Sequence, residues 1–547
     1  MDDEQRAYRR AYDLLEGVQA EDPRGALAEV VHAQQVARRH AWNRVDLVLQ
    51  LVAVVHDLVH GPDARTDARV EDLMAQSRRT SQLALVACAL GVRGVLRNLH
   101  GDTRQMLEDA ANAMVILDDE ELPAQDRATG YTIIAAAYNS LRLWELTDEL
   151  YELATQAGRR DPKPVMQAAL AVNPVLIRVE WALALVEVGD DVEATRQLER
   201  AHAALALARD TPMPALWSQV RESCACVIGL LTGVDVPDDD VVVSNIEALR
   251  RDGDTQMLPM VEAAWVLARY RRAGHRREVR DARLAARDLL TPTGTIAPSS
   301  SSSTFPAWVR AQVLAGSTSS PLRLPVRPQQ TRALQAQSDH AKLVVRSSWE
   351  SRRAVLAAAY AQIRVARGRT ERERLVHAAS TDPLTGLSNR RVFDDWLSGV
   401  DTVGSPSGLL LVDVDDFKGV NDTYGHAIGD DVLRALAGVL RECEEAGDVS
   451  VRLGGDEFAV LVPRMAHPAA LEERARRIGD RVQGYPWSTL AVGVQVRVSS
   501  GWSVGGSHED GETGPGGRLG TYRRADQDLY AGKRGGGLSG GLSSLVR

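Results

Sequence analysis

Apolar residues in the first half of the chain recur at the three- and four-residue spacing of helix faces, and strand-like alternation is rare. Helix-like stretches end at glycines spaced by about 40–45 residues, with Leu143-Trp144 in the one missing place. A glycine at such a place would cap one helix before its partner begins. The pattern predicts an all-helical region over residues 1–290, with these glycines at the helix ends: Gly17, Gly61, Gly101, Gly189, Gly233 and Gly274.

Helix pairs that repeat at this length resemble tetratricopeptide arrays with a longer unit, and they predict an α-solenoid. An irregular helical bundle is the alternative. A solenoid would offer a concave surface on which a protein or peptide partner could bind, although the sequence identifies no partner. We expect residues 1–290 to be a sensory or interaction domain.

The composition then changes twice. Ser and Pro dominate residues 291–329, which predicts a linker. Residues 330–379 contain no proline and many charges, which predicts one connecting helix. Trp349, Leu356 and Ile363 recur every seven residues, as in a short coiled-coil seam. A solvated helix that rests on one domain is the alternative.

Residues 380–547 alternate between helix-like and strand-like patterns. The continuous apolar run 409–412 predicts a strand buried on both faces, and residues 450–463 predict a β-hairpin. We expect an α/β sandwich with an antiparallel central sheet. Its other predicted elements are a helix from Leu384 capped by Asp382, helices at 431–445 and 471–482, strands near 492–500, and a last helix to Lys533.

Composition excludes several classes of protein. The net charge of −9 and the pI near 5.8 leave no basic footprint for nucleic acid. The start lacks a secretory pattern and no apolar run reaches about 18 residues, so we expect a cytoplasmic protein without a membrane span. Four cysteines suit a reducing compartment, and we interpret Cys224 and Cys226 as buried thiols rather than zinc ligands.

The candidate chemistry lies in the predicted hairpin. Gly454 and Gly455 can adopt turn conformations, and Asp456 and Glu457 present hard oxygen donors beside them. Asp413 ends the preceding buried strand and could meet the hairpin tip. Three carboxylates of this kind would suit Mg²⁺ that is also held by phosphate oxygens.

Four segments together resemble the GGDEF family of diguanylate cyclases: DPLTGLSNRR (382–391), DVDDFKGVNDTYGHAIGD (413–430), RLGGDEF (452–458) and RRADQDLYAGK (523–533). The resemblance covers roughly the last third of the chain. It implies a palm-like fold that condenses two GTP into cyclic di-GMP with release of two pyrophosphates. It also implies a homodimer that brings two active sites together, through the cyclase domains and the connecting helix.

The resemblance also implies residue roles. Asp413, the Val414 backbone, Asp456 and Glu457 would hold Mg²⁺, or Mn²⁺ in its place, and Glu457 could instead help to deprotonate the 3′-hydroxyl. Lys418 and Lys533 would supply positive charge to the phosphates. The remaining substrate contacts would come from Phe417, Gly454 and Gly455, and from Asn421 and Asp430 at the guanine edge, with a helix N-cap as the other interpretation of Asp430.

Two segments depart from the family pattern. Glu445-Ala446-Gly447-Asp448 stands where the family has an inhibitory Arg-x-x-Asp, so we expect no product inhibition there. Gly537 stands where a phosphate-binding arginine is usual, and Arg534 could replace it. A Gly-rich insertion at 505–518, with His508, is interpreted as a surface loop. The rival hypothesis is therefore a catalytically weak or inactive GGDEF domain that serves as a GTP receptor or scaffold, with a tetratricopeptide-like domain that binds a partner.

Overall fold

The computed structural model describes residues 3–18, 23–159, 166–289, 305–315, 328–398, 407–463, 469–505 and 517–535. The chain divides into two compact units, Met1–Gly368 and Arg369–Arg547.

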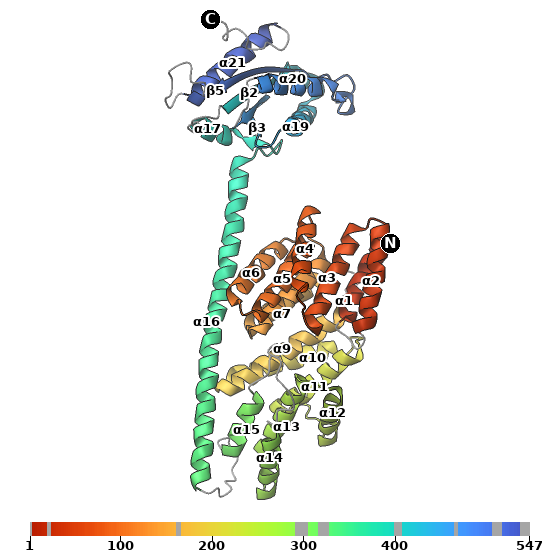
Figure 1. Cartoon of the computed structure of the whole chain (residues 1–547), viewed down its shortest axis with the longest axis vertical. Helices are drawn as coiled ribbons and strands as arrows, with labels where there is room; N and C mark the ends of the chain where they lie inside the picture. The colour runs from red at the N-terminus through yellow and green to blue at the C-terminus, as the bar shows by residue number, and fades with distance from the viewer. Residues whose placement is uncertain are drawn as a thin grey trace. The chain divides into compact units, whose positions relative to one another are not determined.

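The first unit is built from helices (Figure 1). Successive helices pack against each other in pairs, from α1 with α2 to α13 with α14. Their bounds are α1 Asp3–Gly17, α2 Pro23–Arg39, α3 Asn43–His60, α4 Thr66–Arg79, α5 Leu83–Leu99, α6 Thr103–Leu117, α7 Ala124–Ser140, α8 Trp144–Gly158, α9 Gln167–Val188, α10 Asp191–Ala208, α11 Ala215–Thr232, α12 Asp239–Asp252, α13 Met257–Arg272 and α14 Arg276–Asp288.

The predicted glycines lie at the ends of the first helix of each pair. Gly189 and Gly233 cap α9 and α11 with φ of 85° and 77°, in the left-handed region that a side chain would disfavour. At the missing place, Arg142 takes φ of 56° in the turn between α7 and α8. The all-helical prediction is confirmed, while the likeness to tetratricopeptide arrays stays a prediction.

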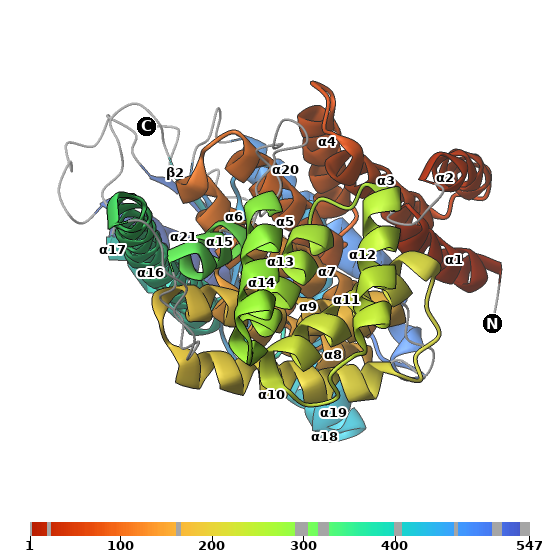
Figure 2. The ribbon, with the colours of Figure 1, turned by 90° about the horizontal axis from the view of Figure 1, so that it is seen from below.

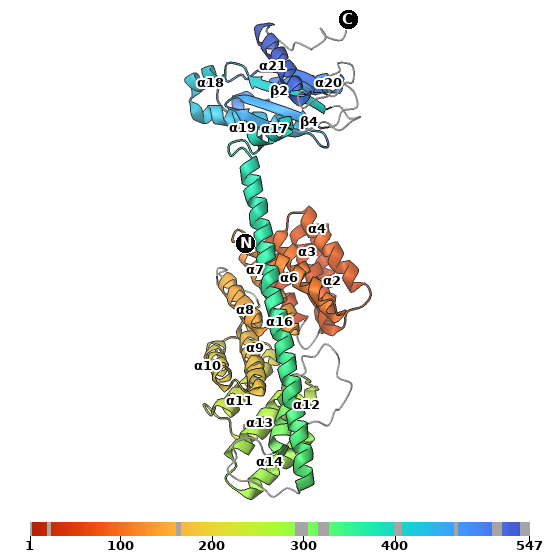
Figure 3. The ribbon, with the colours of Figure 1, turned by 90° about the vertical axis from the view of Figure 1, so that its left-hand side faces the viewer.

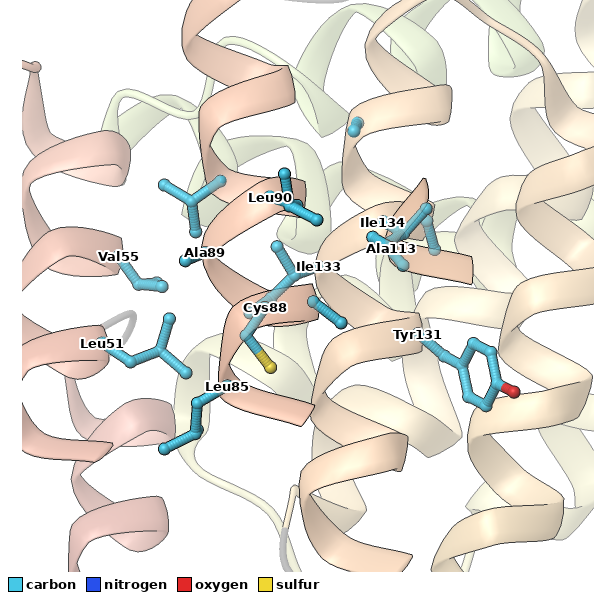
Figure 4. Close-up of a cluster of buried hydrophobic side chains, with 14 of the residues drawn as sticks. Leu51, Val55, Leu85, Cys88, Ala89, Leu90, Ala113, Tyr131, Ile133 and Ile134 are labelled. Atoms are coloured by element: carbon cyan, nitrogen blue, oxygen red, sulfur yellow. The ribbon is translucent and has the colours of Figure 1, made fainter. Parts of the chain in front are cut away.

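Apolar side chains from facing helices form the core of this unit. Figure 4 shows Cys88 of α5 among Leu51 and Val55 of α3 and Ile133 of α7. Burial raises the pKa of the Cys88 thiol well above its usual value. A second cluster buries Cys224 and Cys226, as predicted, and burial raises the pKa of Cys226 to about 11.

Helix α9 alone among the described helices is long and apolar enough to cross a membrane. It has 22 residues and a windowed hydropathy of 1.6. Its apolar side chains pack against α8, α10 and α11 within the first unit. Length and composition therefore do not distinguish this helix from a core helix.

The predicted linker, residues 291–329, contains helix α15 (Phe305–Ala315). Phe305, Trp308, Val309 and Val313 are buried in the cluster that α13 and α14 also line. Figure 2 shows α15 beside α13 and α14. This part of the segment is thus a packed helix and not a loose linker; most of the Ser/Pro-rich remainder lies outside the described residues.

The predicted connecting helix is α16, which spans Pro328–Ser380, and its first part to Gly368 belongs to the first unit. Ile363 is buried in the first unit's core, and Trp349 and Leu356 pack against it. Figures 1 and 3 show this stretch beside α6. The predicted seam therefore packs against its own chain. This matches the alternative interpretation, a helix that rests on one domain.

The second unit is an α/β fold around five strands in the order β1-β3-β4-β2-β5. Only the edge pair β1–β3 is parallel among the described pairs, so the antiparallel core is confirmed. The bounds are β1 Ser388–Asn389, α17 Arg390–Ser398, β2 Ser407–Val414, α18 Phe417–Tyr424, α19 His426–Cys443, β3 Val449–Gly454, β4 Glu457–Val462, α20 Ala469–Gly484, η1 Trp487–Thr489, β5 Val498–Gly505 and α21 Gly517–Gly535.

Strand β2 is an inner strand of this sheet, between β4 and β5, and it is buried along its whole length. Leu410 and Val412 face α19 and α20, and Leu409 and Leu411 face α17 and α21, because successive strand residues point to opposite faces. Both faces are covered by helices. This explains why the strand is a continuous apolar run in the sequence.

Several local predictions in this unit were wrong. Residues from Leu384 form a turn, in which Thr385 donates to Asp382, and the helix begins at Arg390. The helix predicted at 431–445 begins at His426, so Asp430 lies inside α19 and is no N-cap. The strand expected near 492–500 begins at Val498.

Candidate active site

The hairpin tip is a turn that only flexible residues fit. Gly454 and Gly455 have φ of 148° and 55°, as expected. Glu457 pairs in register with Asp413 at the end of β2, and the Val414 backbone N–H donates to the carbonyl oxygen of Asp456 at 3.2 Å. The sheet thus brings the three predicted carboxylates to one edge, which the sequence alone left as a hypothesis.

Lys533 of α21 reaches this edge. Its Nζ lies 2.7 Å from Oδ1 of Asp413. Burial alone would lower the pKa of Lys533, but the bond to Asp413 and the nearby charges raise it. Burial raises the pKa of Asp413; Lys533 opposes that rise, and Asp456 and Glu457 add to it. The net rise in the Asp413 pKa comes first from burial and then from the two neighbouring carboxylates, and Lys533 offsets it only in part.

The donor set suits a hard divalent cation, since it consists of carboxylate oxygens with a surplus of negative charge. Asp413 is almost wholly buried, whereas Glu457 is exposed to incoming groups. Among the described side chains, no group of three or more His, Cys, Asp or Glu lies close enough together to hold a metal ion by itself. The residues fit a cation that is completed by oxygens from a substrate rather than by the protein alone.

Arg452 ties the hairpin tip to the start of the unit, a role that the sequence reasoning missed. Its guanidinium donates to the carbonyl oxygen of Gly455 at 2.7 and 3.1 Å and to Asp382 at 3.1 Å. Burial would raise the pKa of Asp382, but hydrogen bonds from Thr385 and Arg452 lower it. Both residues stand in motifs that the sequence shows, Arg452 in RLGGDEF and Asp382 in DPLTGLSNRR. The sequence therefore contained a signal for this contact.

The turn from β2 into α18 positions the next residues. Asp416 adopts φ of 50° and accepts a hydrogen bond from the Gly419 N–H, which caps α18. Ser499 of β5 donates to Asp415 at 2.6 Å, and this contact too was missed. Lys418 is exposed in the first turn of α18. Helix α18 therefore begins directly after the short turn that follows Asp413 at the end of β2.

Asn421 and Asp430, the predicted guanine contacts, lie where α18 packs on α19. A Cβ built on Gly429 would lie 2.0 Å from Oδ1 of Asn421 and 3.3 Å from the Phe417 ring. Any side chain at 429 would displace Asn421. This glycine is the sequence signal for the close packing of Asn421 against α19.

The segment that replaces the family's inhibitory motif is closed by internal ion pairs. Arg474 of α20 lies 2.6 Å from Glu445 and 3.2 Å from Asp448, and Arg477 lies 3.3 Å from Glu445. Glu445 thus pairs with two arginine side chains, whereas the arginine of the family motif would supply a positive charge to the product. The loss of product inhibition there stays a prediction. Gly537, the side chain of Arg534 and residues 506–516 with His508 lie outside the described residues.

The comparisons with known proteins concern the last third of the chain. A family model described as "Diguanylate cyclase, GGDEF domain" matches residues 379–538. The response regulator PleD of Caulobacter vibrioides is 38% identical over 162 residues, which are 29% of this chain and 35% of PleD. The diguanylate cyclase DgcM of Escherichia coli is 40% identical over 130 residues, 22% of this chain and 32% of DgcM. The chain spans about a third of the length of these relatives.

Among solved structures, the coiled coil and GGDEF domain of DgcB from Caulobacter crescentus, in complex with c-di-GMP, is 34% identical. The match covers 34% of this chain and 95% of that structure, with a TM-score of 0.29. The family match covers the sheet, the hairpin tip and α21. Residues 379–538 of this chain are therefore a GGDEF domain homologous to those of diguanylate cyclases.

Proposed function

We propose that the chain is a diguanylate cyclase that condenses two GTP into cyclic di-GMP and two pyrophosphates. The observation that carries the proposal is the edge where Asp413, Asp456 and Glu457 meet with Lys533 as partner. A surplus of carboxylates next to helix N–H groups and lysines suits a metal-bound triphosphate.

Each chain would bind one GTP. Asp413, Asp456, the Val414 backbone and Glu457 would hold Mg²⁺, or Mn²⁺ in its place, and the ion would neutralise charge on the phosphates. The 3′-hydroxyl of each GTP would attack the α-phosphorus of the other, and the bond to the β-phosphate oxygen would break with departure of pyrophosphate. Glu457, which is exposed at the tip, would accept the hydroxyl proton if it does not bind the metal.

The chain's other residues would bind and select the substrate. The first turn of α18, with Phe417 and Lys418, would approach the phosphates together with Gly454 and Gly455. Lys533 would leave Asp413 for a phosphate oxygen as the cation arrives. Asn421 and Asp430 would recognise guanine, because a carboxylate accepts from its N1–H and N2–H₂ donors.

We further propose that the protein acts as a homodimer in the cytoplasm, and that the first unit controls the cyclase domain. Two catalytic units are needed because the two bonds form between substrates held by different chains. A protein or peptide partner of the first unit would be the input. The control would reach the cyclase domain through α16, which joins the two units.

The test is incubation of the full chain with GTP and Mg²⁺ and analysis of the products by chromatography and mass spectrometry. Cyclic di-GMP and pyrophosphate are expected from the unmutated chain and not from Asp456→Ala or Glu457→Ala. Asp431→Ala is the matched control, because its carboxylate pairs with Arg434 on the outside of α19. GTP binding without product, in the full chain and in a fragment from Gln330 onward, would favour the receptor or scaffold hypothesis.

A further inference from the structure

One face of α16 is both a heptad seam and a buried interface. Ala359 and Ile363 are 0% and 4% exposed in the core of the first unit. The residues that face the unit follow the alternating three- and four-residue spacing of a coiled coil: Trp349, Arg352, Leu356, Ala359, Ile363 and Ala366. The next seam positions are polar, Thr370, Glu373 and His377, so the apolar part of the seam ends where the docking ends.

A buried arginine fixes the docked position. The guanidinium of Arg352 lies 4.1 Å from the ring centre of Trp349 and 5.1 Å from that of Trp144. It donates to both carboxylate oxygens of Glu145 at 2.6 and 2.8 Å, and to the carbonyl oxygen of Arg142 at 3.1 Å. Arg352 is only 8% exposed, so Glu145 is needed to compensate its buried positive charge.

The rest of the interface is polar and lies at its rim. The Tyr360 hydroxyl donates to Glu149 at 3.0 Å, and Arg367 lies 3.0 Å from Asp118. Exposed pairs of this kind contribute little each. The docked state therefore depends chiefly on the apolar face and on the pair of Arg352 with Glu145, and one substitution on α8 should weaken it.

We propose that two partners compete for this face: α8 and its neighbours in the same chain, and α16 of a second copy. A side chain packed against α8 cannot at the same time enter a hole in another α16, so docking withholds the seam. The second copy is the partner that the heptad spacing fits. The consequence for catalysis rests on the proposed function: docking would hold the cyclase domain in a state that pairs poorly.

The test uses Glu145→Ala in the full chain. It leaves the seam intact and removes the partner of Arg352, so we expect self-association at least tenfold tighter by sedimentation equilibrium, and more product per chain at low protein concentration. Glu152→Ala is the matched control, since Glu152 is on the same helix but pairs with Arg178 and Arg200. The double variant Glu149→Ala/Asp118→Ala, expected to act more weakly in the same direction, replaces Glu145→Ala if that chain fails to fold.

Disulfide trapping identifies the paired face. Leu356→Cys should cross-link two chains in the Glu145→Ala background and much less without it, while Ala358→Cys, on the exposed face, should not. The four native cysteines are buried and give little background. Unchanged association, or cross-linking through Ala358→Cys instead, would overturn the proposal. Tighter association with trapping at Leu356→Cys but no cyclic di-GMP would uphold the shared face and reject the proposed enzyme activity.

Discussion

Buried carboxylates in the two units have opposite surroundings. In the helical unit, Asp109 accepts from Arg93 at 2.7 and 2.9 Å and from Arg97 at 2.6 Å. Asp126 accepts from Arg44 at 2.7 Å and from the hydroxyls of Tyr8 and Tyr12. Each of these carboxylates has more donors than one charge needs. In the second unit, buried Asp413 pairs with one lysine, Lys533, and the nearby Asp456 and Glu457 add negative charge.

The difference separates charges that hold the fold from charges that serve chemistry. A buried carboxylate with several donors is satisfied without a ligand, and its loss leaves those donors unpaired. A cluster with surplus charge lowers stability until a cation or substrate arrives. The surplus at Asp413, rather than the number of acidic residues, therefore marks the site.

The largest expected effect is on activity. Asp413→Asn should lower cyclic di-GMP formation by more than about 100-fold, because it removes a charge from the proposed metal site. The free energy of unfolding should change by less than about 1 kcal/mol, since the raised pKa shows that the fold disfavours the ionised form. Product assays and chemical denaturation measure the two effects, with Asp431→Asn as the control. A large loss of stability would place Asp413 with the structural carboxylates.

The next effect is on stability. Asp126→Asn should lower the free energy of unfolding by about 3 kcal/mol, because it breaks a buried ion pair and leaves two tyrosine hydroxyls with a poorer acceptor. This value is at the low end of the range for breaking a buried ion pair, because the Arg44 side chain is one-third exposed. Denaturation followed by far-ultraviolet circular dichroism should show the loss. Glu29→Gln removes the exposed pair with Arg10 in the same unit and should cost less than about 1 kcal/mol.

The helical unit could be predicted from the regular spacing of glycines at the ends of helix-like stretches. Glycines such as Gly189 mark helix ends because they adopt the left-handed cap most readily, and that requirement is local. The sequence did not decide whether α16 pairs with a second copy or packs on its own chain, because a heptad of apolar residues suits both arrangements. Helix α15 was missed because the Ser/Pro composition around it outweighed Phe305 and Trp308.

In the second unit the apolar run at 409–412 predicted β2, and the paired glycines predicted the hairpin of β3 and β4. These patterns did not predict the turn at Asp382, where Asp-Pro resembles a helix start but Thr385 and Arg452 capture the carboxylate. Long-range partners decided that case. The same holds for Ser499 beside Asp415, which are 84 positions apart in the chain.

Asp382 tests the comparison inside one unit, with the smallest expected effect. Its pKa is lowered, so its ionised form stabilises the fold; this contribution is fully present above about pH 4, the unfolded value, and is lost as pH falls through the lowered pKa. The pKa of Asp413 is shifted in the opposite direction, because its raised pKa makes ionisation cost stability as pH rises.

Asp382→Asn should therefore lower the free energy of unfolding by about 1 kcal/mol or less at pH 7, given its partial exposure, and by less still below pH 4. Denaturation at a series of pH values measures that gap. Since Arg452 still holds Gly455, product formation should fall only slightly; a loss as large as that of Asp413→Asn would break the distinction between compensated and surplus charge.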